Sequence, residues 1–260
     1  MMNYLRSEFY RAFRTKGFYL FTGAGMALLV AMNVVLWACG RDTPSFQYNT
    51  TAFSFSMVYY GGFQFVLVLT LALSAIIFGN EFKNKTINNS VAFGCSREML
   101  FIGKLLVTLV CSLVCLVAVI GALLGSGYLL LRHDGMEDAA RVLRAVASCT
   151  PILICGACGA VSLFYVLGSE TKGSWIWCLL IFGVTGAVSL LGMKFELFAR
   201  LSSWMIYNIV TENHTNPDTG LTVMVWETAE GLRRCIMAGV MGTLVFFVLG
   251  LAGVHKKELK

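Results

Sequence analysis

Six stretches of the chain, each at least 20 residues long, contain no Asp, Glu, Lys, Arg or His. A helix needs about 20 predominantly apolar residues to cross a bilayer. We therefore expect six transmembrane helices, over residues 17–38, 58–78, 105–131, 145–168, 174–193 and 235–254. The longest connection, residues 194–234, is too short for a soluble domain of ordinary size. The pattern predicts an all-α polytopic membrane protein with a single transmembrane domain over residues 1–260.

The charged residues between these stretches predict the orientation of the chain. With both termini in the cytoplasm, the inner side carries twelve Lys and Arg residues and five acids. The outer side carries eight Lys and Arg residues and nine acids. Cytoplasmic loops are enriched in Lys and Arg, so the asymmetry favours this orientation. Arg233 and Arg234, at the outer end of the last stretch, go against the rule, as do Arg132, Arg141 and Arg144.

Composition agrees with a membrane protein, since 57% of the residues are hydrophobic and 13% are charged. In soluble domains about 45–50% of the residues are hydrophobic and about 25% are charged. The net charge of +6 invites comparison with nucleic-acid-binding proteins. However, the basic residues lie in short segments beside the spans, where anionic lipid headgroups attract them. We therefore expect the lipid bilayer, and no nucleic acid, as a partner.

The usual sequence signatures of catalysis are missing. The chain has no H-E-x-x-H, G-x-S-x-G or G-x-x-x-x-G-K-[ST] motif, which mark zinc hydrolases, serine hydrolases and ATP-binding loops. Its spans lack the charges that proton relays and ion-coupled carriers use. Cys155 and Cys158 form a C-x-x-C pair, but without a second ligand pair or a His we expect buried thiols and no metal site. We expect neither enzyme activity nor a cofactor in this chain.

The N-terminal segment 1–16 has Leu5, Phe9 and Phe13 at i, i+4 and i+8, with its basic residues on other faces. This spacing predicts an amphipathic helix in the cytoplasmic interface of the membrane. Such a helix serves either as a simple anchor or also as a contact for a cytoplasmic partner, and the pattern favours neither.

The inner connection 79–104 is longer than the 2–8 residues that join neighbouring helices in a bundle. The sequence predicts a helix stop at Gly94, after residues 83–93, and an N-cap at Ser96, with Glu98 in the first turn of the following helix. We therefore predict a short helix parallel to the membrane. A plain reverse turn is the alternative, but the length and caps favour docking to something in the cytoplasm.

The outer segment 194–234 contains a run, 195–209, with eight large apolar residues. The run is too short to span a bilayer. We expect it to dip into the outer interface or to lie across the exit of the helix bundle. Phe198 and Trp204 are its candidate gate residues.

The sequences YLRSEFYRAFRTKGFYLF and NEFKNKTINNSVAFGCSREMLFIGK, together with six spans and a long outer segment, resemble the type-2 ATP-binding-cassette (ABC) permeases. The likeness is greatest to small bacterial members that act in antimicrobial-peptide immunity or export. In that family a Glu-Phe-x-x-x-Thr segment begins the coupling helix, which seats in a groove of the ATPase subunit. The resemblance puts Glu81, Phe82 and Thr86 at those positions, although many members have Gly where this chain has Lys85. The candidate ATPase-coupling residues are Glu81, Phe82, Lys83, Thr86, Ile87, Asn88 and Arg97.

The resemblance implies a permease subunit of an ATP-driven exporter in a bacterial plasma membrane. ATP and Mg²⁺ would bind to two partner ATPase subunits, and a second permease, either a copy or a paralogue, would complete the pathway. Antimicrobial peptides, drugs or other amphiphiles are the implied substrates. The alternative is a non-transporting sensor or assembly scaffold whose inner loop binds a cytoplasmic partner.

Rare polar and aromatic residues of the spans are candidates for lining the pathway. They are equally well explained as partners in interhelical hydrogen bonds or as interfacial aromatic residues. These residues are Asn33, Tyr59, Tyr60, Gln64, Thr70 and Thr185.

Overall fold

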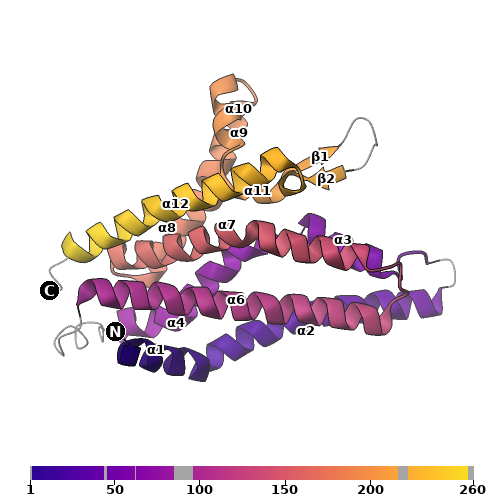
Figure 1. Ribbon diagram of the computed structural model, residues 1–260, viewed down its shortest axis with the longest axis horizontal. Helices are drawn as coiled ribbons and strands as arrows, with labels where there is room; N and C mark the ends of the chain where they lie inside the picture. The colour runs from indigo at the N-terminus through magenta and orange to yellow at the C-terminus, as the bar shows by residue number, and fades with distance from the viewer. Residues whose placement is uncertain (1, 44–45, 62, 85–95, 216–221, 257–260) are drawn as a thin grey trace.

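Figure 1 shows the fold, taken from a computed structural model of the chain. The structure describes residues 2–43, 46–61, 63–84, 96–215 and 222–256. Long helices lie side by side along one axis, and both termini lie at the same end of this bundle (Figure 1). We call this the inner end, which the predicted topology puts in the cytoplasm, and the opposite end the outer end.

Helices dominate the described residues. In chain order they are α1 (Met2–Arg14), α2 (Lys16–Asp42), α3 (Thr51–Gly61), α4 (Phe65–Asn84), α6 (Arg97–Leu130), α7 (Glu137–Leu167), α8 (Glu170–Cys178), the π-helix η1 (Leu179–Val184), α9 (Thr185–Gly192), α10 (Glu196–Ser202), α11 (Ile206–Thr211), the 3-10 helix η2 (Val225–Glu227) and α12 (Ala229–Lys256). Among the described residues, α2, α6, α7, the continuous α8–η1–α9 and α12 are long and apolar enough to cross a membrane. The pair α3 and α4 makes a sixth span if it is counted as one broken helix. The predicted all-α polytopic class is confirmed.

The second span differs from the single helix predicted over 58–78. It begins earlier, at Thr51, and α3 and α4 meet at an angle of 69°. The sequence has two consecutive glycines at the break, Gly61 and Gly62, and glycine costs up to about 1 kcal/mol in a helix interior. Gln64 donates a hydrogen bond from Nε2 to the carbonyl oxygen of Gly61 at 3.0 Å. Glycine flexibility and this local bond explain the bend.

The start of α6 follows the predicted capping pattern. Ser96 is the N-cap, its hydroxyl accepts a hydrogen bond from the Met99 backbone N–H at 3.3 Å, and Glu98 lies in the first turn. The helix has 34 residues, which corresponds to about 51 Å at 1.5 Å per residue. Because the hydrocarbon core is only about 30 Å thick, α6 extends well beyond it.

Small residues bring α7 and α12 into close contact. A Cβ atom at Gly239 would lie 2.6–2.8 Å from atoms of Pro151, including its backbone carbonyl, and one at Gly242 would lie 2.5 Å from Cys155 Sγ. Glycine at these positions allows the close approach of helices that is typical of membrane bundles. This contact fixes α12 against the centre of the bundle.

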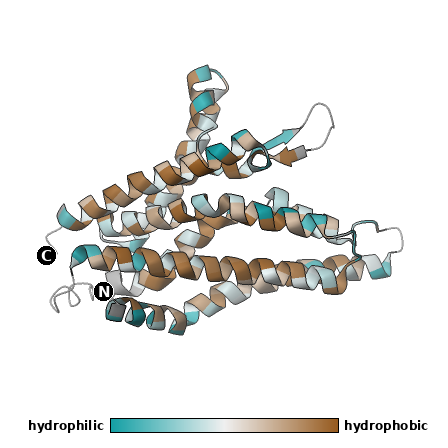
Figure 2. Cartoon of the chain, viewed as in Figure 1, coloured by the Kyte–Doolittle hydropathy of each residue, from teal (hydrophilic) through white to brown (hydrophobic). Residues whose placement is uncertain are grey.

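The outer segment forms several short elements. Its apolar run becomes α10 and α11, and the strands β1 (Asn213–Thr215) and β2 (Thr222–Met224), which were not predicted, pair antiparallel after it. Figure 1 shows α9 and α10 projecting from the side of the bundle. Hydrophobic residues follow the length of the long helices, and hydrophilic residues gather near their ends (Figure 2).

Candidate functional site: the inner junction and the lateral cavity

A buried ion pair joins the N-terminal helix to the bundle. Glu8 of α1 accepts a hydrogen bond from the Lys104 ammonium of α6 at 2.5 Å, and both side chains are less than a tenth exposed. Arg11 donates a second charged hydrogen bond to the same carboxylate oxygen at 2.8 Å. Buried charges require such partners. The N-terminal helix therefore packs on the bundle through a specific electrostatic contact.

Three helices meet at Lys104. Its ammonium lies 5.0 Å from the centroid of the Phe78 ring on α4, within the range of a cation–π contact. On the other side, the Tyr4 ring of α1 packs over Gly103, where a Cβ atom would lie 2.6 Å from Tyr4 Cε1. Because α4 continues from Phe78 into Glu81, the residues Tyr4, Glu8, Phe78, Gly103 and Lys104 connect α1 and α6 to the start of the predicted coupling segment. We call these five residues the inner junction.

The electrostatics of the inner junction keep Glu8 ionised. Burial alone would raise the pKa of Glu8, but the Lys104 ammonium and the Arg11 guanidinium lower it below its ordinary value. Burial, and then the negative charge of Glu8, raise the pKa of Tyr4. At neutral pH, Glu8 is therefore a carboxylate and Tyr4 is a neutral phenol.

A second feature is an apolar cavity of about 600 Å³, open to the surface, in the angle between α8–η1–α9, the start of α11 and α12. Its lining residues are Trp177, Leu180, Ile181, Val184, Thr185, Trp204, Met205, Ile206, Met237, Ala238, Met241, Gly242 and Phe246. We call it the lateral cavity. It contains Thr185, a predicted pathway residue, and Trp204, a predicted gate residue. The structure thus brings together two side chains 19 residues apart in the sequence.

The wall of the lateral cavity includes an unusual backbone. Leu180, Ile181 and Val184 belong to the π-helix η1, which interrupts the fifth span. π-Helical turns are rare and occur often at functional sites. Nothing in the local sequence predicts this one.

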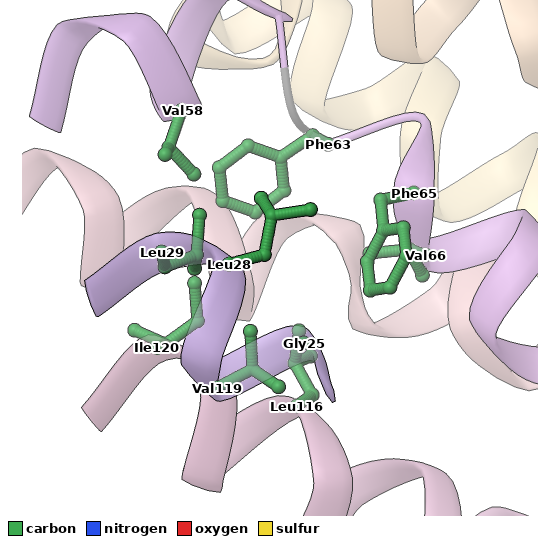
Figure 3. A pocket seen from close by; sticks show the side chains of 10 residues that line it. All are labelled: Gly25, Leu28, Leu29, Val58, Phe63, Phe65, Val66, Leu116, Val119 and Ile120. Atoms are coloured by element: carbon green, nitrogen blue, oxygen red, sulfur yellow. The ribbon is translucent and has the colours of Figure 1, made fainter. Parts of the chain in front are cut away.

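A smaller apolar cavity of about 250 Å³ lies beside the bend between α3 and α4. Figure 3 shows side chains of α2, α6 and the bend converging on it. Its lining residues are Gly25, Leu28, Leu29, Val58, Phe63, Phe65, Val66, Leu116, Val119 and Ile120. The bend therefore borders unfilled apolar space.

The family model described as ABC-2 family transporter protein matches residues 4–186, well over half of the chain. The chain belongs to the ABC-2 transporter family. The matched region includes the inner junction and ends inside α9, so α12 lies outside it. No curated protein and no solved structure matches the chain. As an ABC-2 permease, it is a multi-pass membrane subunit that acts with an ABC ATPase.

The middle of the predicted coupling region of this permease, residues 85–95, lies outside the described residues. Glu81, Phe82 and Lys83 belong to the last turns of α4, so the helix of the second span continues into the Glu-Phe segment. Thr86, Ile87 and Asn88, and with them most of the predicted helix over 83–93, fall in the part of the chain that is not described. Arg97 is the first residue of α6.

Asn33 lies completely buried between three helices of the permease. Its Nδ2 donates to the Leu123 carbonyl oxygen at 3.1 Å and to Ser126 Oγ at 2.7 Å, and its Oδ1 accepts a bond from Ser54 Oγ at 2.5 Å. Thr70 is also buried and donates to the Leu67 carbonyl oxygen within its own helix at 2.9 Å. Interhelical hydrogen bonding, the alternative to a pathway role, accounts for the contacts of Asn33.

The other predicted pathway residues surround the bend. Tyr59 is buried, its ring centroid lies 6.0 Å from that of Trp226, and Tyr60 packs edge-on against it. Gln64 accepts a hydrogen bond from the Tyr207 hydroxyl of α11 at 3.1 Å. The outer segment is therefore in direct contact with the break in the second span. Phe198, the other gate candidate, contacts Phe195 and does not line the lateral cavity.

The Glu8–Lys104 pair was not predicted from the sequence. In the charge count, Glu8 is one of the five inner acids and Lys104 is one of the twelve inner basic residues. A local signal existed, because Tyr4, Glu8 and Ala12 follow one another at i, i+4 and i+8 on one face of α1. The partner could not be found this way, because it lies 96 residues away.

The lowered pKa of Glu8 predicts how docking of α1 depends on pH. A glutamate carboxyl in an unfolded chain has a pKa near 4.3, and that of Glu8 in the folded protein is lower. Glu8 therefore contributes fully to the stability of the docked α1 above about pH 4.3, and this contribution is lost as pH falls through the folded pKa. We expect spin labels at Ser7 and Met99 to give one unchanged distance from about pH 7 to 5 and a broadened distribution below about pH 4. A distance that already broadens at pH 6 would contradict the assignment, and Glu8→Gln should remove the acid transition.

Proposed function

We propose that this ABC-2 permease is the membrane subunit of an exporter that moves amphiphilic or antimicrobial peptides or drugs out of a bacterial plasma membrane. ATP and Mg²⁺ would be bound by two partner ATPase subunits, and the permease itself would hold no cofactor and catalyse no reaction. A second permease, either a copy or a paralogue, would complete the pathway. The observation that carries this proposal is the inner junction.

The inner junction provides a mechanical route from the ATPase to the spans. Closure of the ATPase pair would move the loop 79–104, whose two ends are the last turns of α4 and the beginning of α6. Phe78 and Lys104 tie those ends to each other and to Glu8 of α1. The three helices would therefore move as one body, as in rigid-body switching of other proteins.

The bend supplies a place where that motion can be absorbed. The break after Gly61 separates α3 from α4 by 69°, and the neighbouring cavity leaves apolar space for Phe63 and Phe65 to rearrange. Hinges are commonly a few residues at the ends of helices. A shift of α4 would also reach the outer segment through the Gln64–Tyr207 hydrogen bond.

The cavities support an amphiphilic substrate. Both are lined by apolar side chains, with Thr185 as the one polar lining residue among those described. A hydrophilic solute would lose its hydration in such surroundings without gaining hydrogen bonds. A molecule with a hydrocarbon part would instead be taken from the bilayer.

Drug tolerance tests the proposed function. Cells that express the permease with its ATPase should survive higher concentrations of at least one agent in a panel of cationic peptides, bacitracin-like compounds, lipophilic drugs and anionic amphiphiles. A hydrolysis-dead ATPase should abolish the gain. Phe82→Ala should reduce it to a similar extent, because Phe82 is the apolar residue expected to dock on the ATPase.

The matched control is Phe195→Ala, which removes an exposed phenylalanine ring on the outer segment and should leave ATPase binding unchanged. Membrane content of each variant is measured by immunoblot. Equal sensitivity of all cells to the whole panel would contradict export and favour a sensor or scaffold. Retained tolerance in Phe82→Ala cells would contradict the coupling role of this residue alone.

A further inference from the structure

The lateral cavity has a charged residue at its outer end. Arg234, Ala238 and Met241 are spaced i, i+4 and i+7 on α12, so they share one face of the helix. Ala238 and Met241 line the cavity. Arg234 therefore lies one turn outward from the lining, on the same face. The lining runs along α12 from Met237 to Phe246, a rise of about 14 Å.

This arginine is unusual in its position and weakly held by its partner. Arg233 and Arg234 lie at the outer end of the last span, against the positive-inside rule. Arg234 pairs with Glu230 one turn away, but the Glu230 side chain is 75% exposed and that of Arg234 is 28% exposed. Exposed pairs of this kind contribute about 0–1 kcal/mol. An anion of suitable geometry can therefore replace Glu230 at little cost.

We propose that the lateral cavity binds the hydrocarbon chain of an amphiphile whose anionic headgroup is held by Arg234. The inference rests on the proposed function and narrows its substrate class from amphiphiles in general to anionic, lipid-like ones. Guanidinium groups bind phosphate and carboxylate through two parallel hydrogen bonds. A cationic peptide would instead meet a like charge at this end of the cavity.

The lining suits a flexible chain. Met205, Met237 and Met241 contribute thioether side chains, which adapt to irregular apolar shapes. Trp204 lies at the surface, 45% exposed, and tryptophan commonly sits at the boundary between headgroups and hydrocarbon. A volume of about 600 Å³ falls in the range of ligand pockets, about 300–1,000 Å³. The headgroup would thus lie at the interface and the chain beside α12.

Binding can be measured with brominated amphiphiles, because bromine quenches tryptophan fluorescence on contact. The permease–ATPase complex is placed in phosphatidylcholine nanodiscs and titrated with three probes that share one brominated alkyl chain. Their headgroups are phosphate, phosphocholine and trimethylammonium. The signal from Trp204 is the difference between the complex and its Trp204→Phe variant. We expect the phosphate probe to half-saturate this signal at a concentration about tenfold below that of the trimethylammonium probe.

Charge variants locate the headgroup site. Arg234→Gln should remove the preference for phosphate, Arg234→Lys should keep part of it, and Glu230→Gln should strengthen binding of the phosphate probe. The matched control is Arg141→Gln, which removes an arginine that also pairs with an acid of its own helix, Asp138, at the outer end of α7. This helix contributes no residue to the lining. It should change probe binding less than about twofold, as expected for a distant surface charge. Inorganic phosphate should not displace the probe, because the chain supplies most of the binding.

Several results would overturn the proposal. Equal quenching by the anionic and cationic probes would show that the cavity does not select headgroups. Equal effects of Arg141→Gln and Arg234→Gln would show general surface attraction, and displacement by inorganic phosphate would show an ion site without a chain. If ATPase-dependent tolerance to a cationic peptide persists in any of these cases, the inference fails while the proposed function stands. If the cavity binds the phosphate probe selectively but the cells gain no ATPase-dependent tolerance, the proposed function fails and the binding site stands.

Discussion

Replacing Lys104 with Met should release α1 from α6 and abolish transport. The substitution removes the buried cation beside the Glu8 carboxylate and leaves the half-exposed Arg11 as the basic group in contact with it among the described residues. Removing one member of a buried ion pair typically costs about 3–5 kcal/mol, because the remaining charge loses its partner without regaining water. Glu8 can recover that water only if α1 moves away from the bundle. The expected result is therefore detachment of α1, with the spans still inserted.

Cleavage by trypsin after Arg11 and Arg14 would report this detachment in inside-out vesicles. We expect rapid cleavage in Lys104→Met and slow cleavage in the wild type. The matched control, Lys172→Met, removes an exposed lysine from the inner end and should behave like the wild type. Adding Glu8→Gln to Lys104→Met should restore part of the protection, because no buried charge then remains. Identical cleavage of the Lys104→Met and Lys172→Met proteins would contradict the role of the inner junction.

The spans were predictable because lipid imposes one requirement on all of them. A helix that crosses hydrocarbon must satisfy its own backbone hydrogen bonds and carry apolar side chains, so uncharged stretches reveal α2, α6, α7 and α12 directly. The cap at Ser96 is equally local, since one hydroxyl and the N–H three residues later decide it. The bend after Gly61 was missed because hydropathy does not distinguish a straight span from a broken one.

The candidate site depends on contacts that are distant in the sequence. Polarity and aromatic character singled out Thr185 and Trp204, but only packing of the fifth span against α12 shows that both line one cavity. Cavities arise where side chains fail to fill space, and no local pattern records such a failure. The same limit applies to Glu8, whose burial is decided by its contact with Lys104. Arg234 was recognised as a departure from the charge rule, and the structure adds the cavity beside it.

Replacing Gly239 with Leu should have the second large effect. A Cβ atom there would lie 2.7 Å from the Pro151 carbonyl carbon and 2.8 Å from its oxygen, and backbone atoms cannot move aside as a flexible side chain can. Overpacking of a tight contact commonly costs about 1–3 kcal/mol. If the leucine is not accommodated within this contact, α12 must separate from α7 along their shared interface. We expect a lower apparent melting temperature and less folded protein by size-exclusion chromatography.

The matched control is Gly121→Leu, because a Cβ atom at Gly121 meets nothing within 4 Å. Leucine has a higher helix propensity than glycine by up to about 1 kcal/mol, so this variant should be as stable as the wild type or more so. Equal destabilisation by both substitutions would contradict the packing argument. Because Ala238 and Met241 lie on the same helix as Gly239 and line the lateral cavity, displacement of α12 should also weaken binding of the phosphate probe. Stability and ligand binding should therefore fail together in Gly239→Leu and survive together in Gly121→Leu.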